Sequence, residues 1–253
     1  MSEPGVKASD RLIVALDVAN IQAARDIVAA LDGVVNFFKV GLTLQLAEGA
    51  EQFIHELLRS GKRVFLDYKY YDIPATVRLA VKRAAELGVT FLTIHGSSEI
   101  IQQAVVGRDA GNAGRADKLR LFTVTVLTSM DEKDIREMGY SGSIKELVMF
   151  RARKACEAGC DGVIASAEEA QELKKQFQSL VVVTPGIRDE NSPPDDQKRT
   201  ATPREAIQAG ADYLVVGRLI TDPKKYTSYA TPREAAAAIL REMQAALDHR
   251  REN

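Results

Sequence analysis

The sequence predicts a single (β/α)8 barrel domain that comprises residues 1–253. Eight short apolar, β-branched runs alternate with stretches in which apolar residues recur at helical spacing. Nearly continuous apolar strands joined by helices are typical of a parallel sheet that helices cover on its outer side. Repeated units of about 30 residues fill the chain without a linker or a shift in composition, which favours one barrel.

The eight strands are expected in order along the chain, with a helix after each. They are LIVALDV (12–18), FFKVGL (37–42), VFLDYK (64–69), FLTIHG (91–96), LFTVTVL (121–127), GVIAS (162–166), VVVTPGI (181–187) and YLVVGR (213–218). The apolar spacing in IQAARDIVAAL (21–31) and VRLAVKRAAEL (77–87) predicts helices between them. A doubly wound open sheet is the alternative, but ALDVANIQ (15–22) lacks the glycine fingerprint usual after its first strand.

Glycines and capping residues mark where these helices end and begin. Four predicted helices end in glycine shortly before the next strand, in SGKRV (60–64), LGVTF (87–91), AGCDGV (158–163) and AGADYL (209–214). The segment TPREA occurs at 202–206 and 231–235, where Thr at the N-cap, Pro at N1 and Glu at N3 form a capping box. These two copies are predicted to start the last two helices.

Composition limits the class of partner and cofactor. The formal charge is −1, with 34 basic and 35 acidic residues, so no overall field attracts nucleic acid or an anionic membrane. No run of 18 apolar residues occurs and the N-terminus lacks an apolar signal segment, which predicts a cytoplasmic protein. Cys156 and Cys160 are interpreted as small buried hydrophobes. No metal-ligand spacing and no glycine-rich dinucleotide loop occurs, so neither a metal nor an organic cofactor is expected.

Polar residues gather where the predicted strands end, which is the functional face of such barrels. They are Asp17, Lys39, Asp67, Lys69, His95, Thr128-Ser129, Pro185-Gly186-Ile187-Arg188 and Gly217-Arg218. Asp67 and Lys69 are two apart on one strand, so both are expected to face the barrel axis while Tyr68 faces outward. Together with Asp17 and Lys39 they give alternating charges in a small volume. A purely stabilising ionic network is the alternative, but such networks add little stability, which favours a functional role. His95 is left without a role.

A phosphate-bearing ligand is expected near the last two strands. Gly217 and Arg218 offer a backbone N–H and a guanidinium at the usual phosphate position of these barrels. The segment 188–201 (RDENSPPDDQKRTA) is long for a β/α connection and contains several basic residues, which favours a lid over the active face. A solvated loop is the alternative for this segment.

The ordered set of motifs resembles a known family, the bacterial orotidine 5′-phosphate decarboxylases. The matching motifs are ALD (15–17), FKVG (38–41), DYKYYDIPATV (67–77), TVLTS (125–129), VTPGIR (183–188), DQKR (196–199) and VVGR (215–218). The similarity spans essentially the whole chain. It implies a homodimer with shared active sites that converts orotidine 5′-monophosphate to UMP without a cofactor. The chain departs from the family's usual H-D-I-P-N-T at Tyr71 and Ala75.

The resemblance also implies roles for single residues. Lys69 resembles the proton donor and Asp67 the carboxylate beside the leaving CO2, and Asp72 and Thr76 resemble residues that reach into the partner's site. The other expected positions are Asp17 and Lys39 at the ribose hydroxyls, Lys39 also within the catalytic charge network, Thr128 at the base, Pro185 in the substrate site, and Arg188, Gln197, Gly217 and Arg218 at the phosphate and lid.

This chemistry explains why charges follow the apolar run at 64–66. A pyrimidine ring that loses CO2 keeps an electron pair without a conjugated sink, so nearby positive charge and a ready proton are needed. Lys69 supplies both, and flanking carboxylates at Asp67 and Asp72 favour its ammonium form. Two other functions stay open, a metal-dependent sugar-phosphate decarboxylase or synthase of the related barrels, and a barrel that only binds a nucleotide.

Overall fold

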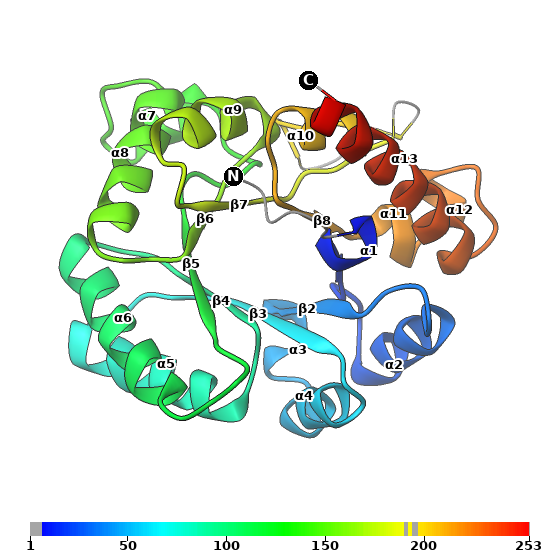
Figure 1. The fold of residues 1–253 in the computed structure, drawn as a ribbon, viewed down its shortest axis with the longest axis horizontal. Coiled ribbons are helices and arrows are strands. Elements are labelled where there is room, and N and C mark those ends of the chain that lie inside the picture. Colours follow the sequence, from blue (N-terminus) through cyan, green and yellow to red (C-terminus); the bar gives the residue numbers. More distant parts are fainter. Residues whose placement is uncertain (1–6, 190–191, 194–196, 253) are drawn as a thin grey trace.

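The computed structural model describes residues 7–189, 192–193 and 197–252, and within these ranges the chain forms a closed parallel barrel (Figure 1). The strands follow one another around it in chain order, and β1 pairs with β8 to close it. They are β1 (Leu12–Ala15), β2 (Phe37–Gly41), β3 (Arg63–Tyr70), β4 (Phe91–Ile94), β5 (Arg120–Val124), β6 (Gly162–Ile164), β7 (Val181–Thr184) and β8 (Tyr213–Val216). The predicted (β/α)8 barrel is confirmed and the open sheet is wrong.

Helices surround the barrel on its outer side (Figure 1). They are α1 (Ala8–Arg11), α2 (Ile21–Ala30), α3 (Leu42–Gln45), α4 (Ala50–Arg59), α5 (Pro74–Leu87), α6 (Ser98–Asn112), α7 (Glu132–Glu137), α8 (Ile144–Glu157), α9 (Ala167–Gln176), α10 (Pro203–Gln208), α11 (Arg218–Thr221), α12 (Pro223–Tyr226) and α13 (Pro232–Glu252). Among the described residues, no helix is long and apolar enough to cross a membrane. One domain over all 253 residues stays a prediction, because parts of the chain lie outside the described residues.

The four predicted C-terminal ends of helices are confirmed, and the predicted N-terminal starts are confirmed in part. The glycines expected to end four helices all have positive φ, namely Gly61, Gly88, Gly159 and Gly210. Both TPREA segments form capping boxes, through Thr202 with Glu205 and Thr231 with Glu234. The prediction that they start the last two helices is wrong. They start α10 and α13, and the four-residue helices α11 and α12 lie between, too short to show a periodic pattern.

Two apolar layers fill the molecule. The larger lies between the strands and the helices, and the smaller lies inside the barrel. Four phenylalanines dominate the inner layer, with Phe91 4.9 Å from Phe37 and 4.4 Å from Phe122 between ring centroids. Phe65 belongs to the same layer and also lines the cavity described below. The aromatic rings therefore fill the barrel beneath the cavity and confine it to the carboxyl ends of the strands.

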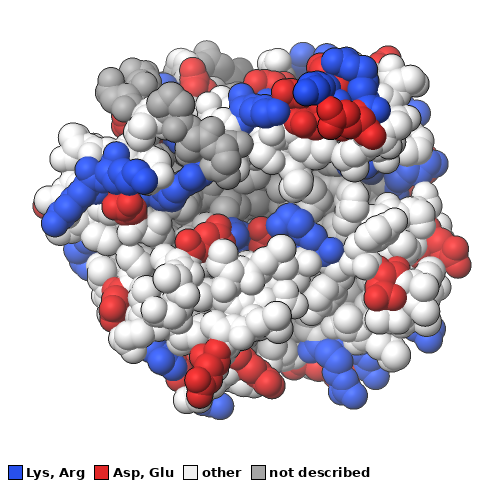
Figure 2. Space-filling view, turned by 180° about the vertical axis from the view of Figure 1, so that it is seen from behind, with Lys and Arg blue, Asp and Glu red and all other residues white. Residues whose placement is uncertain are grey.

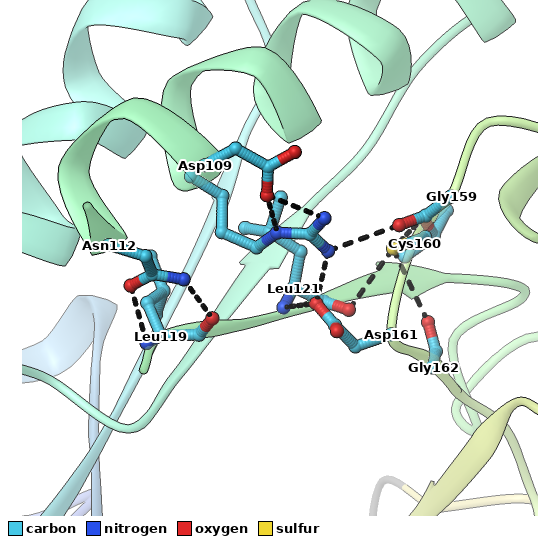
Figure 3. A network of polar contacts seen from close by, with 10 residues as sticks. Asp109, Asn112, Leu119, Leu121, Gly159, Cys160, Asp161 and Gly162 are labelled. Atoms are coloured by element: carbon cyan, nitrogen blue, oxygen red, sulfur yellow. Dashed lines mark hydrogen bonds and ion pairs between the residues drawn. The ribbon is translucent and has the colours of Figure 1, made fainter. Parts of the chain in front are cut away.

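Polar contacts fix the amino ends of β5 and β6 to helix α6 (Figure 3). Arg108 Nη1 donates to Asp161 Oδ2 at 2.6 Å and to the Gly159 carbonyl at 3.0 Å. The same Asp161 oxygen accepts the Leu121 N–H at 2.8 Å. Cys160 is buried and its thiol contacts the Leu121 carbonyl at 3.1 Å, whereas Cys156 is only half-buried. These contacts satisfy backbone groups at the end of the barrel opposite the cavity, and they make Cys160 a structural residue as expected.

Candidate active site

Four charged side chains meet at the carboxyl ends of the first three strands. Asp17 follows β1, Lys39 lies on β2, and Asp67 and Lys69 lie on β3. Lys39 Nζ is 2.9 Å from Asp17 Oδ1 and 3.4 Å from Asp67 Oδ2, and Lys69 Nζ is 2.9 Å from Asp67 Oδ1. The predicted alternation of charge in a small volume is confirmed. Figure 2 shows acidic and basic side chains side by side at the central hollow of the face opposite to that of Figure 1.

The backbone of β3 is irregular where it carries these residues. Pairing with β4 runs from Leu66 to Tyr70 through a register shift, and Lys69 has a φ of 49°, the one positive value among described non-glycine residues. Regular alternation, from which the sequence analysis placed Asp67 and Lys69 on one side, is therefore interrupted. Their side chains still meet, and Tyr68 packs against the outer core as expected. A side chain in the left-handed region costs free energy, and such strain gathers at functional sites.

Thr93 on β4 supports this irregular backbone, and sequence reasoning missed it. Its side chain is fully buried. Its hydroxyl donates to Asp67 Oδ1 at 2.9 Å and accepts the Lys69 N–H at 3.0 Å. A neutral residue inside an apolar strand gives no signal of this kind, because Thr is common in strands.

The electrostatic environment keeps the central pair charged. Burial alone lowers the pKa of Lys39, but the charges of Asp67 and Asp17 outweigh it and hold that pKa above its usual value. Burial likewise raises the pKa of Asp67, and the ammonium groups of Lys39 and Lys69 outweigh it, so that the pKa is lowered. Gly41 leaves room for this packing, since a Cβ there would lie 2.9 Å from both Asp17 Oδ1 and Lys39 Nζ.

A cavity of about 420 Å³ opens beside the charged residues, a size suited to a small ligand. Most of the predicted site residues line it, namely Asp17, Lys39, Asp67, Lys69, Thr128, Pro185, Arg188, Gln197, Gly217 and Arg218. Apolar residues that the sequence analysis did not single out complete the wall, among them Val124, Ile164 and Val215. All the strands except β3 end earlier than expected, and Thr128 lies in the loop four residues after the end of β5.

The structure does not bring Asp72 and Thr76 into this cavity. Both are exposed, and the Asp72 carboxylate accepts the N–H of the next residue, Ile73, at 2.6 Å. Among the described contacts within one copy, Asp67 is the carboxylate that pairs with Lys69, so the expectation that Asp72 flanks a Lys69 stays a prediction that depends on a second copy. Asp72 lies past the end of β3, and Pro74 starts helix α5 there.

The connection after β7 contributes the opposite wall. The predicted lid, 188–201, includes residues 190–191 and 194–196, which lie outside the described residues. In its described end, Gln197 Oε1 accepts a short hydrogen bond from the Thr128 hydroxyl. Two expected site residues from different loops therefore meet directly.

His95 has a structural environment. Its Nδ1 lies 3.2 Å from the Val124 carbonyl oxygen, and its ring packs edge-on against Tyr71. Burial and the nearby Arg151 lower the pKa of His95, which favours the neutral ring at neutral pH. Among the described residues, no group of three His, Cys, Asp or Glu could hold a metal ion.

A closed (β/α)8 barrel with a charged cavity at the carboxyl ends of its strands defines an enzyme class that acts on small molecules. The chain belongs to the orotidine 5′-phosphate decarboxylase / HUMPS family, whose model matches residues 10–238.

Named relatives agree with this family. The chain is 53% identical over 243 residues to the orotidine 5′-phosphate decarboxylase of Nitrobacter winogradskyi, with 95% of each chain covered. It is 44% identical over 239 residues to that of Rhodopseudomonas palustris, covering 94% of this chain and 96% of the relative. The crystal structure of the orotidine 5′-phosphate decarboxylase of Lactobacillus acidophilus superposes with a TM-score of 0.79 at 36% identity, covering 92% of this chain and 99% of that one.

Proposed function

We propose that this protein decarboxylates orotidine 5′-monophosphate to UMP and CO2, a step of pyrimidine biosynthesis. The observation that carries the proposal is the charge network of Asp17, Lys39, Asp67 and Lys69 at the cavity wall. Each relative named above is an orotidine 5′-phosphate decarboxylase, which does not favour the alternative of a sugar-phosphate decarboxylase or synthase. The likeness to bacterial biosynthetic enzymes supports a cytoplasmic location as part of the proposal.

Lys69 is the proton donor in this mechanism. The bond between the ring carbon and the carboxylate breaks, CO2 leaves, and the electron pair stays on the ring carbon. The Lys69 ammonium stabilises that pair and then transfers a proton to it, leaving a neutral amine that solvent reprotonates. Support comes from the Lys69 Nζ, which lines the cavity and is held 2.9 Å from Asp67 Oδ1. The left-handed backbone conformation at Lys69 determines the direction in which the side chain that carries this ammonium leaves β3.

Asp67 stands beside the substrate's own carboxylate in this proposal. The lowered pKa of Asp67 keeps it an anion at neutral pH. Two carboxylates in contact repel each other, and the repulsion disappears when one leaves as neutral CO2. Because Lys39 and Thr93 also bind Asp67, the anion cannot move away from the substrate without losing these contacts.

The remaining cavity residues bind the parts of the nucleotide that do not react. Asp17 and Lys39 are assigned to the ribose hydroxyls, Lys39 also to the catalytic charge network, and Thr128 and Pro185 to the base end of the cavity. Arg188, Gln197, Gly217 and Arg218 are assigned to the phosphate. A guanidinium binds a phosphate with charge-assisted hydrogen bonds, and this remote binding energy positions the ring for reaction.

The proposal includes a homodimer with shared active sites. Asp72 and Thr76 are exposed and outside their own cavity, so they are free to serve the cavity of a second copy. Large apolar side chains beside them are exposed as well, Tyr71 by 68%, Ile73 by 66% and Leu79 by 61%. Exposed apolar residues grouped on one face are typical of an interface between protein chains.

The test is the absorbance change that accompanies decarboxylation of the pyrimidine. Purified protein is incubated with orotidine 5′-monophosphate, with and without a chelator, and the ultraviolet spectrum is followed. We expect rapid conversion to the spectrum of UMP in both samples. An unchanged spectrum would favour the alternative of a barrel that only binds a nucleotide. Loss of conversion with the chelator would favour the metal-dependent alternative.

A further inference from the structure

A buried arginine outside the cavity joins three of the loops that form its wall. Arg199 lies near the end of the β7–α10 connection, two residues after Gln197, and its side chain is 8% exposed. It does not line the cavity. A charged side chain this deeply buried needs partners, and its contacts show what it holds in place.

The guanidinium of Arg199 reaches two neighbouring connections. Nη1 forms an ion pair with Glu169 Oε1 and donates to Ser166 Oγ at 3.2 Å, both at the start of α9 after β6. Nη2 donates to the carbonyls of Val126 and Leu127, each at 3.1 Å, in the loop after β5. Val126 and Leu127 line the cavity, directly before Thr128.

The backbone of Arg199 adds contacts to the same place. Its N–H donates to the Thr128 carbonyl at 3.1 Å. Gly186 packs so close that a Cβ there would lie 2.8 Å from the Arg199 carbonyl oxygen. Arg199 therefore ties together the connections after β5, β6 and β7, at the point where the Thr128 hydroxyl bonds to Gln197.

We propose that Arg199 is a positioning residue that, with Glu169, holds Thr128 and Gln197 in the geometry that binds the nucleotide. The inference rests on the proposed function for its kinetic readout. An ion pair buried this deeply is weak as a source of stability, because desolvation offsets the attraction, whereas its fork of hydrogen bonds specifies the position of two loops. The reacting groups are untouched, so the effect is on substrate binding more than on the chemical step.

The test compares conservative variants with a matched control. Arg199→Lys keeps a positive charge beside Glu169 but loses the planar fork that also reaches Val126 and Leu127. We expect a folded protein whose kcat/KM falls on the order of tenfold, with KM affected more than kcat, and whose affinity for UMP falls in parallel. Glu169→Gln should also lower kcat/KM and the affinity for UMP, and it replaces Arg199→Lys in the test if that variant does not fold. Lys198→Met is the control. It removes the positive charge of the neighbouring residue, which forms an exposed ion pair with Asp131, and should change kcat/KM less than twofold.

The same substitution made in a Thr128→Val protein distinguishes a positioning role of Arg199 from a general effect on stability. If Arg199 acts through Thr128, Arg199→Lys should cost much less kcat/KM when Thr128 is already Val, because coupled residues are not additive. Fully additive losses, or a lowered Tm with kcat/KM and UMP affinity within twofold of wild type, would overturn the proposal. If wild-type protein binds UMP but has no decarboxylase activity, the proposed function fails alone, and the same comparison is then read from UMP affinity.

Discussion

Thr93 connects the two residues on which the proposed chemistry depends. Its hydroxyl binds the carboxylate of Asp67 and the backbone N–H of Lys69 at the same time. Because Lys69 has an uncommon left-handed backbone, the bond to its N–H stabilises a conformation that the chain alone disfavours. Thr93 is therefore expected to set the position of Lys69, the proposed proton donor, without touching the substrate.

Thr93→Val should lower kcat about tenfold, a barrier change of ~1.4 kcal/mol, because a hydrogen bond to a charged group is lost and the N–H of Lys69 is left unpaired. KM should change little, since the residues assigned to the phosphate are unchanged. Steady-state kinetics with orotidine 5′-monophosphate measure both constants. Thr93→Ser keeps the hydroxyl and should restore most of kcat. Thr123 is a buried Thr on the neighbouring strand β5, and Thr123→Val should leave kcat within twofold. A Thr93→Val enzyme as fast as Thr123→Val would contradict the assigned role.

The charged residues of the site could be predicted from sequence, whereas their supports could not. Asp17, Lys39, Asp67 and Lys69 are conspicuous because charges are costly where apolar strands end. Thr93 and Gly41 carry no such signal, because Thr suits any strand and the space a glycine leaves depends on the neighbouring strand. The role of Arg199 depends on loops after three strands, which only the fold brings together.

At the scale of elements, strands and helix ends were predicted because they depend on local sequence. Apolar runs located all eight strands, and glycines located four helix ends. The irregularity in β3 was not predicted, because a register shift depends on the pairing with β4. The position of Asp72 outside its own cavity agrees with the expectation from the family resemblance, whereas periodicity alone says nothing of where a loop after a strand turns.

The charge network that joins β1, β2 and β3 should make stability depend on pH at both extremes. The pKa of Asp67 is lowered below its unfolded value of about 3.9, so its contribution is present above about pH 4 and is lost as the pH falls through the folded pKa. The pKa of Lys39 is raised above about 10.4, so its contribution is present below about pH 10 and is lost as the pH rises through the folded pKa.

Urea unfolding between pH 5 and pH 3 measures the acid side. Wild-type protein should lose stability over this range, and the double variant Lys39→Met/Asp67→Asn should lose less, because Asp67 no longer takes up a proton on unfolding. The control Lys133→Met/Glu137→Gln removes an exposed pair 3.7 Å apart with the same net charge change and should follow wild type. If the stability of Lys39→Met/Asp67→Asn fell as steeply with pH as that of the control, the pKa of Asp67 would not be lowered by folding.

At the scale of the whole molecule, the proposed shared sites predict complementation between two inactive variants. Lys69→Ala and Asp72→Asn should each be nearly inactive alone. In a mixed dimer, both lesions fall in one composite site and leave the other whole, because a two-fold interface exchanges the same loop in each direction. With random assortment, half the dimers are mixed, so roughly a quarter of wild-type activity should return after the two variants are refolded together.

Subunit exchange must be verified in that mixture, for example by mass spectrometry of differently tagged copies. A mixture that stays at the summed activity of the two parents, despite exchange, would mean that Asp72 serves its own chain. The exposure of Asp72 outside its own cavity is what favours the shared arrangement.

The central claim, that the Lys69 ammonium protonates the carbanion formed when CO2 leaves, is tested most directly by Lys69→Ala. Turnover of orotidine 5′-monophosphate is measured by absorbance, and binding of UMP to the same preparation by calorimetry. We predict that turnover falls by several orders of magnitude while UMP still binds, because the variant lacks the proposed proton donor but keeps Arg188 and Arg218, which are assigned to the phosphate. Near-normal turnover in a folded Lys69→Ala protein would contradict the mechanism.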